Sequence, residues 1–409
     1  MNRTNGGANL LALRSHNTAL VLDLLRTAGP EGISRLELAD RTGLTPQAVS
    51  KITARLREEG LAAEAGRRAS TGGKPRTVLR LVPGAGHAVG VHLDRDELRA
   101  VLVDLNGMVV GERRTPLDLG AGAQAVVAAV AREAEGMAAE ALGPRNGGPR
   151  PEALRPTGEG PVGAAGGDSG GAVPAGPTTP DSPLAASSLV AVGSLVGVGV
   201  ALPGPLDHAR GVLHRVTGFP EWDGFPLRDA LARRLGVPVV VDKDTNAAAL
   251  GLAVGGAGRS FAYLHLGTGL GAGLVIGGAV HRGARTGAGE FGHQVIQLDG
   301  PRCGCGNRGC VEALCLGAVA RGEIGEAARV LGAGAANLVG LLDIDLVLLG
   351  GRTVAAAPEA FVRGVAAVLD ERARGAGAVP VRVAPGGERG VAEGAAQLLL
   401  GPLFGRADG

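Results

Sequence analysis

All four cysteines of the chain lie within thirteen residues, at Cys303, Cys305, Cys310 and Cys315. Three thiolates in a C-x-C-x4-C spacing, together with His293 ten residues upstream, supply the four ligands that a tetrahedral zinc ion takes. Such clustering indicates metal binding in a reducing compartment rather than a set of disulfides. The sequence therefore predicts a structural zinc ion held by His293, Cys303, Cys305 and Cys310, with Cys315 as a buried thiol in a following helix.

Acidic side chains follow the β-branched run Val237–Val241, which predicts a buried strand. Asp242 and Asp244 would stand at its carboxyl end, where an open α/β sheet binds its ligand and a carboxylate can act as a general base on a hydroxyl. Capping of the next helix is an equally good interpretation for either aspartate. Glycines alternate over Leu266–Gly273, a pattern that suits a backbone anion site or a glycine-rich hairpin.

A helix-turn-helix pattern occupies the N-terminal part of the chain. Ser34 and Glu37 form a capping box, Gly43 provides a tight turn, and Thr45 followed by Pro46 begins a second helix. A basic, glycine-containing hairpin follows, as in a winged helix that lays its second helix in the major groove. A helical dimerisation module with a solvated basic face is the alternative. The residues expected at DNA are Thr45, Gln47, Ala48, Ser50, Lys51 and Arg55 on the helix and Arg67, Arg68, Lys74 and Arg76 in the wing.

The distribution of charge supports a polyanionic partner for this N-terminal part. The 409 residues carry a formal net charge of +2, but residues 1–80 hold 13 Lys and Arg against 7 Asp and Glu, and the remainder holds 28 against 32. The net charges are thus +6 and −4. The positive excess lies where double-stranded DNA would bind. Only eight residues are aromatic, which argues against a stacking platform for single strands.

Two segments bear on the domain organisation. Residues 143–188 hold 11 Gly and 9 Pro among 46 residues, so we expect a disordered insert that cannot bury enough apolar surface to fold. Residues 185–206 carry no charge and are long enough to cross a bilayer. Their Pro-Gly-Pro and the lack of basic or aromatic flanks favour two successive buried strands instead. We therefore expect no membrane association and, with no recognisable signal peptide, a cytoplasmic protein.

Taken together, these motifs resemble the ROK family of repressors, open reading frames and kinases. The resemblance covers residues 88–400 outside the insert and rests on 199–207, 242–248, 266–273, 289–293, 303–312 and 348–351. It implies an α/β fold: a duplicated actin-like (sugar kinase/Hsp70-like) domain with its ligand between the lobes. The helix-turn-helix resembles the regulator branch. We therefore expect a winged helix-turn-helix over residues 1–82 and an actin-like ligand-binding domain over residues 83–409.

The resemblance also implies roles for individual residues in the cleft. Asp244 matches the catalytic base of the kinases, and Glu290, His293 and Glu312 match their sugar contacts. Lys243 stands where the family usually has an asparagine. Its cation would suit a phosphorylated or acidic ligand.

One departure separates the regulator from the kinase interpretation. The kinases bind the phosphates of ATP with an Asp-x-Gly-Gly-Thr turn, and the matching stretch here is His92–Glu97, which lacks both glycines and holds three acidic residues. Side chains there block close backbone approach, and carboxylates repel a triphosphate. We therefore predict a dimeric or higher-order transcriptional repressor, responsive to a sugar, that binds operator DNA, needs no ATP and is not an enzyme. An ATP-dependent hexose kinase using Asp244 is the alternative, and a repressor with no ligand is a third.

Overall fold

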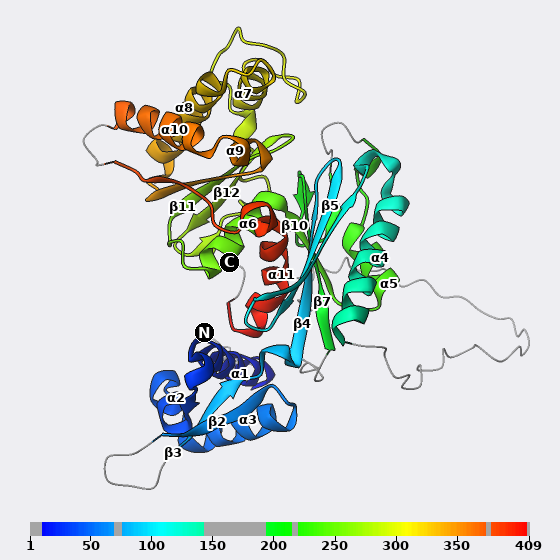
Figure 1. Ribbon diagram of the computed structural model, residues 1–409, viewed down its shortest axis with the longest axis vertical. Helices are drawn as coiled ribbons and strands as arrows, with labels where there is room; N and C mark the ends of the chain where they lie inside the picture. The colour runs from blue at the N-terminus through cyan, green and yellow to red at the C-terminus, as the bar shows by residue number, and fades with distance from the viewer. Residues whose placement is uncertain (1–9, 69–75, 143–193, 215–219, 374–377, 407–409) are drawn as a thin grey trace, which may run out of the picture.

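The computed structural model describes residues 10–68, 76–142, 194–214, 220–373 and 378–406 (Figure 1). The described chain forms an N-terminal winged unit and two α/β lobes. Both the expected insert, 143–188, and Lys74 in the wing lie outside the described residues. Among the helices that the structure describes, none is long and apolar enough to span a membrane.

Local capping signals set the helices of the winged unit. Its elements are α1 (Leu10–Thr27), β1 (Ile33–Ser34), α2 (Arg35–Thr42), α3 (Pro46–Glu58), β2 (Ala62–Arg68) and β3 (Arg76–Leu81). The capping box is confirmed, because Ser34 Oγ accepts a hydrogen bond from the Glu37 amide at 3.3 Å and Glu37 Oε2 accepts one from the Ser34 amide at 2.8 Å. Gly43 ends α2 at a φ of +68°, and Thr45 Oγ1 caps α3 by accepting from the Ala48 amide at 3.2 Å. The three strands pair in the order β1-β3-β2.

The first lobe is a mixed five-stranded sheet in the order β10-β7-β4-β5-β6. Its strands are β4 (Gly86–Leu93), β5 (Glu97–Asp104), β6 (Val109–Pro116), β7 (Ser194–Leu202) and β10 (Val239–Lys243), with a small pair β8 (Leu206–Asp207) and β9 (Val212–Leu213) beside it. β4, β5 and β6 are antiparallel, whereas β7 and β10 join in parallel. Helices α4 (Ala123–Leu142) and α5 (Leu227–Leu235) cover one face, and α11 (Gly390–Leu403) covers the other (Figure 1).

The second lobe repeats this topology in the order β13-β12-β11-β14-β15. Its strands are β11 (Phe261–Leu266), β12 (Leu270–Ile276), β13 (Ala279–Val280), β14 (Leu346–Gly350) and β15 (Val381–Val383). Three antiparallel strands are again followed by two parallel ones. Helices α7 (Val311–Ala320), α8 (Ile324–Leu342) and α10 (Pro358–Arg372) share one core with this sheet, and the short α9 (Arg352–Ala356) follows β14. The expected fold class, a winged helix-turn-helix before a duplicated α/β domain, is confirmed.

Helices α6 (Asp244–Val254) and α11 pack against each other between the two sheets (Figure 1). Glycines in the first sheet allow this close approach. A β-carbon on Gly90 would lie 1.9 Å from the carbonyl oxygen of Ala392, and one on Gly199 would lie equally close to that of Ala395. In the described part of the apolar segment 185–206, β7 ends before Pro203–Pro205 and Leu206 begins β8; residues 185–193 lie outside the described residues.

The winged unit does not stand apart from the first lobe. One apolar cluster joins Leu25 of α1, Leu79 of β3 and Val101 of β5 to Leu399 of α11 and to Phe404 just beyond it, and all five are almost fully buried. The guanidinium of Arg26 lies 4.9 Å from the centre of the Phe404 ring. The N-terminal helix is therefore packed directly on the end of the helix that runs between the lobes.

Candidate functional site

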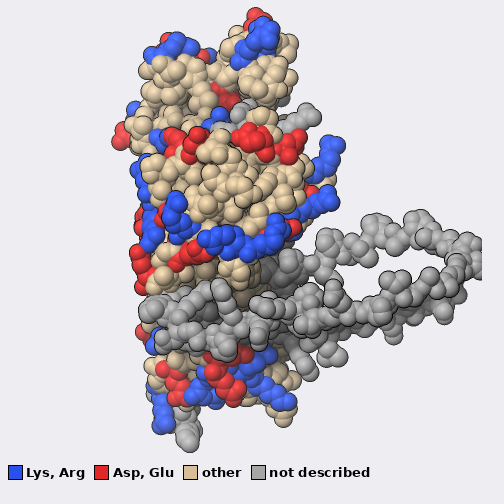
Figure 2. All heavy atoms as spheres, turned by 90° about the vertical axis from the view of Figure 1, so that its right-hand side faces the viewer, with Lys and Arg blue, Asp and Glu red and all other residues tan. Residues whose placement is uncertain are grey.

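Helix α3 carries five of the ten residues expected at DNA. Gln47, Ser50 and Lys51 are exposed and Ala48 is half-buried, whereas Val49 is fully buried in the core of the winged unit. Thr45 precedes the helix as its exposed N-cap. In Figure 2 the winged unit, at the foot of the molecule, shows both basic and acidic side chains. This face of the winged unit is therefore mixed in charge rather than uniformly basic.

Arg55 differs from its neighbours because it is already engaged within the unit. Its Nη2 donates to Thr18 Oγ1 at 2.7 Å, and its Nε lies 3.8 Å from Glu59 Oε1. This side chain therefore ties α3 to α1. In the wing, Arg67 and Arg76 are exposed on the paired strands β2 and β3. The side chain of Arg68 is not described.

A cavity of about 100 Å³ lies between the lobes and is lined by both. The first lobe contributes Asp94, Lys243 and Asp244, the last two at the carboxyl end of β10 as predicted. The second lobe contributes Thr268 from the β11–β12 turn, together with Glu290, His293 and Glu312. The structure thus brings together all five residues expected at the ligand.

The two aspartates after the Val237–Val241 run have different surroundings. Asp242 accepts hydrogen bonds from Asn246 Nδ2 at 3.0 Å and from Arg282 Nε at 2.8 Å, in a buried ion pair that serves the fold. Asp244 faces the cavity, and burial raises its pKa. A carboxylate whose basicity is raised in this way is suited to accept a hydrogen bond or a proton from a ligand hydroxyl.

Lys243 does not offer the free cation that the sequence suggested. Its side chain is 4% exposed, and its ammonium donates to the carbonyl of Ala288 and to Glu290 Oε1, the latter at 3.2 Å. The cationic charge is therefore compensated inside the protein. Glu312 is also held in place, because its Oε2 accepts a hydrogen bond from the Leu270 amide at 2.8 Å.

The predicted zinc ligands converge on one point. One side-chain ligand atom from each of His293, Cys303, Cys305 and Cys310 lies within 4.8 Å of the others. His293 Nδ1 is 3.7 Å from Cys303 Sγ, and Cys305 Sγ is 3.7 Å from Cys310 Sγ. An edge of a tetrahedron built on Zn–S bonds of about 2.3 Å is about 3.8 Å long, so the donor set fits zinc. Cys315 is buried in α7, where burial raises the pKa of its thiol to about 12, and takes no part.

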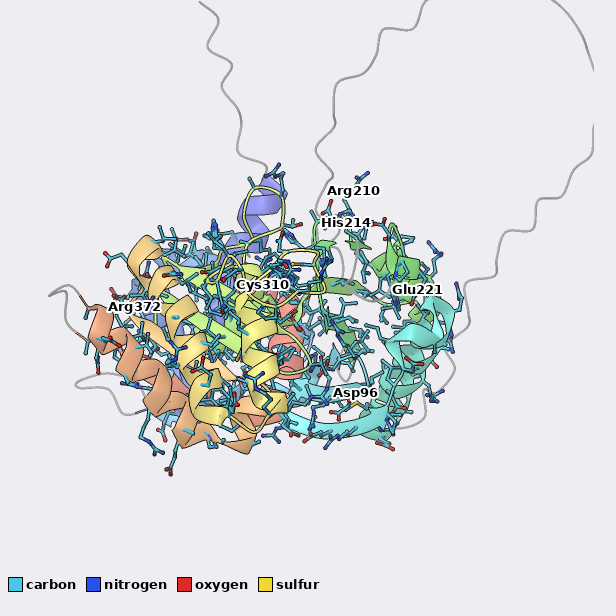
Figure 3. All side chains as sticks on the ribbon, turned by 90° about the horizontal axis from the view of Figure 1, so that it is seen from above. Asp96, Arg210, His214, Glu221, Cys310 and Arg372 are labelled. Carbon is cyan, nitrogen blue, oxygen red and sulfur yellow. The ribbon has the colours of Figure 1, made fainter. Side chains whose placement is uncertain are left out.

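The loop that holds these ligands depends on the glycines between them. Gly309 has a φ of +64°, and a β-carbon there would lie 1.5 Å from the carbonyl oxygen of Gln297. Cys310, which is labelled in Figure 3, is the N-cap residue of α7, and the first turn of this helix carries Glu312. The alternating glycines of Leu266–Gly273 form the β11–β12 hairpin, the second of the two interpretations. A β-carbon on Gly273 would lie 2.0 Å from the carbonyl oxygen of Thr245 in α6.

A second cavity of about 550 Å³ lies beside the first, and no motif in the sequence predicted its extent. Its lining includes His92 and His265, the Gly350–Arg352 segment, and Arg26 of α1. Burial lowers the pKa of His92 to about 3, so this imidazole is neutral at ordinary pH. The acidic turn after β4 is not an uncompensated negative charge, because Arg352 pairs with both Asp94 and Asp96.

Two family models and several known proteins are similar to this chain in sequence. Residues 184–322 match the model of the ROK family, and residues 30–62 match a winged helix-turn-helix DNA-binding model. A protein named putative xylose repressor from Caldicellulosiruptor sp. is 26% identical over 364 residues, which cover 78% of this chain and 79% of that protein. The glucokinase of Thermotoga maritima is 43% identical over 120 residues, but these cover only 28% of this chain and 38% of the enzyme.

A solved structure extends the likeness to nearly the whole chain. The crystal structure of a ROK family transcriptional regulator, described as a homologue of the E. coli MLC protein, matches with a TM-score of 0.72. The match covers 96% of this chain and 97% of that chain, at 20% sequence identity. It therefore shows a shared fold, including the winged unit.

Proposed function

We propose that the chain, which matches the ROK family model over residues 184–322 and a winged helix-turn-helix model over residues 30–62, is a transcriptional repressor that binds operator DNA and responds to a sugar. One observation carries this proposal. The same chain presents an exposed, capped α3 and a cleft that is lined from both lobes by hydrogen-bonding side chains. A ligand that changes the relation between the lobes can then change the placement of the winged unit.

The cleft favours a neutral, polyhydroxylated ligand. Asp244, Glu290 and Glu312 supply carboxylate oxygens, which accept hydrogen bonds from hydroxyl groups. The compensated ammonium of Lys243 leaves little attraction for a phosphorylated or acidic ligand. An unmodified sugar is therefore the better candidate, with Asp244 accepting from one of its hydroxyls.

We infer a structural role for zinc in this site. His293, Cys303, Cys305 and Cys310 would hold the ion, which would supply a rigid crosslink and no reactive position. His293 also lines the cavity, so its Nδ1 would serve the metal while Nε2 is the ring nitrogen left for a ligand. The loop fixed in this way ends at Cys310, two residues before Glu312.

The proposal excludes kinase activity. A triphosphate bound against the β4–β5 turn would compete with Asp94 and Asp96 for Arg352, and these carboxylates would repel it. The identity to a glucokinase and the presence of Asp244 favour the alternative of a hexose kinase. A coupled assay with ATP over a panel of hexoses and aminosugars separates the two. Turnover that is abolished by Asp244→Asn would overturn the regulator-only proposal.

The test of DNA binding starts from selection of bound sites from random double-stranded DNA with the full chain. We expect a two-fold symmetric site, because regulators of this kind bind as dimers, and an affinity that falls steeply with salt. The selection is repeated with D-glucose, D-xylose or N-acetyl-D-glucosamine. The proposal implies a cytoplasmic location. No salt-sensitive, sequence-specific binding in any condition would refute the proposed DNA-binding function.

A further inference from the structure

Four hydrogen bonds cross from the second lobe to the β4–β5 turn of the first. Arg352 Nη2 donates to Asp94 Oδ2 and to Asp96 Oδ1, both at 2.6 Å, and its Nη1 donates to Asp96 Oδ2 at 2.9 Å. Thr268, in the β11–β12 turn, donates from Oγ1 to Asp94 Oδ1 at 2.8 Å. Seen from above in Figure 3, Asp96 lies where the strands of the first lobe meet the helices of the second. We call this group of four residues the interlobe latch.

The backbone fixes Arg352 at this point. Gly351, which precedes it, has a φ of +93°, and a β-carbon there would lie 2.3 Å from the carbonyl oxygen of Leu266. Only glycine brings the start of α9 so close to the end of β11. Arg352 is therefore held beside Thr268, and both side chains reach the same turn of the opposite lobe.

The acceptors of the latch are satisfied and charged. Asp94 Oδ1 accepts from the Arg95 amide at 2.8 Å as well as from Thr268, and its Oδ2 is used by Arg352. Burial acts to raise the pKa of Asp94, but the hydrogen bonds from Arg352 and Thr268 outweigh it and lower the pKa to about 2. The carboxylate is therefore ionised throughout the ordinary pH range.

The latch forms part of the ligand cavity as well as joining the lobes. Asp94 and Thr268 both line the 100 Å³ cavity, and Asp94 also lines the larger one next to it. We propose that Arg352 is a positioning residue of the ligand cleft, which holds Asp94 and Asp96 so that the two lobes close around one ligand. This inference rests on the proposed function only in taking that ligand to be a sugar. Because the sugar would contact both lobes, its apparent affinity is reduced when the closed arrangement is less populated.

The geometry requires a guanidinium. Two nitrogens of Arg352 bind three oxygens on two carboxylates, which the planar fork of arginine permits and the single ammonium of lysine does not. Arg352→Lys should therefore keep the charge but restore only part of the effect that Arg352→Gln removes. A role limited to net charge would give full rescue by lysine.

Hydrogen exchange on the full-length protein tests the latch without any ligand. We expect Arg352→Gln to speed exchange at least severalfold in peptides that cover residues 94–97 of the first lobe and 266–270 of the second. The matched control is Arg329→Gln, because Arg329 makes an equally short bidentate pair with Glu326, but within one helix. Exchange that changes only in α9, or that changes equally in the control, would overturn the proposal.

Calorimetry with D-glucose, D-xylose and N-acetyl-D-glucosamine tests the consequence for binding. A sugar that binds the wild-type protein should bind Arg352→Gln about 3- to 10-fold more weakly, in line with the modest strength of partly exposed ion pairs. Unchanged or tighter binding would contradict the positioning role. If none of the three sugars binds the wild type, the sugar part of the proposed function fails on this panel, while the exchange experiment still decides whether the latch exists.

Discussion

Lys51 provides the sharpest test of the DNA-binding surface. It lies on the exposed face of α3, and within the described residues its ammonium has no hydrogen-bond or ion-pair partner. A positive charge placed about 4 Å from a phosphate in water contributes about 1 kcal/mol, so Lys51→Ala should weaken operator binding about fivefold at moderate salt. Each phosphate contact contributes about 0.9 to the slope of log affinity against log salt. If Lys51→Ala loses one phosphate contact, the ratio of its dissociation constant to that of the wild type should fall about 3.5-fold when the salt rises from about 50 to 200 mM.

Fluorescence anisotropy with a selected site, measured over that range of salt, gives both quantities. The matched control is Arg57→Ala, since Arg57 lies on the same helix but pairs with Glu64 of β2 at 3.0 Å. Arg55→Ala is not a suitable control, because Arg55 bonds to Thr18 and its loss should also destabilise the winged unit. The placement of α3 at the DNA backbone would be refuted if Lys51→Ala bound the operator with the affinity and salt slope of the wild type. It would also be refuted if Arg57→Ala lost as much operator affinity as Lys51→Ala.

Three further outcomes follow from the site. Asp244→Asn should weaken sugar binding at least tenfold, as expected when a charged hydrogen-bond acceptor is lost. Its affinity for operator DNA in the absence of sugar should not change. Calorimetry measures the first quantity and fluorescence anisotropy the second, on the same sample. Metal analysis of freshly purified protein should find one zinc per chain. Cys305→Ser should lose this zinc and melt at a lower temperature, whereas Cys315→Ala should keep it. Zinc retained by Cys305→Ser, or absent from the wild type, would contradict the proposed ligand set. The pKa of Asp94 in the folded protein is about 2, below its ordinary 3.8. The ionised carboxylate therefore contributes its full stabilisation above about pH 4 and loses it as the pH falls toward 2. The difference in unfolding midpoint between wild type and Asp94→Asn should shrink across that range of pH.

Features that depend on interactions between residues close in sequence could be predicted from the sequence. The capping box at Ser34 and Glu37 and the cap at Thr45 depend on contacts three residues apart, so residue type and spacing suffice. The convergence of the four predicted zinc ligands could also be expected, because three of them lie within Cys303–Cys310 and His293 is only ten residues upstream. The repeated sheet could be expected only from the family resemblance, because no periodicity reveals which strands pair.

Contacts between distant parts of the chain could not be predicted in this way. Arg352 and Asp94 are 258 residues apart, so the acidic turn looked like an uncompensated charge that would repel phosphate. For the same reason Lys243 looked like a free cation until the fold placed the carbonyl of Ala288 and the carboxylate of Glu290 beside it. The sequence shows the sign of each side-chain charge, but only the fold shows which neighbouring groups compensate that charge where a ligand would bind.

The packing of α11 limits how the lobes can move without affecting the winged unit. Near its N-terminal end Glu393 lines the larger cavity, and beyond its C-terminal end Phe404 lies under Arg26 of α1. In between, its backbone lies so close to Gly90 and Gly199 that not even a methyl group fits. Close-packed interfaces of this kind move as units rather than deforming continuously. A change in lobe arrangement that moves the first sheet must therefore carry α11 with it, and through the contact between Phe404 and Arg26 it must also move α1 and the winged unit.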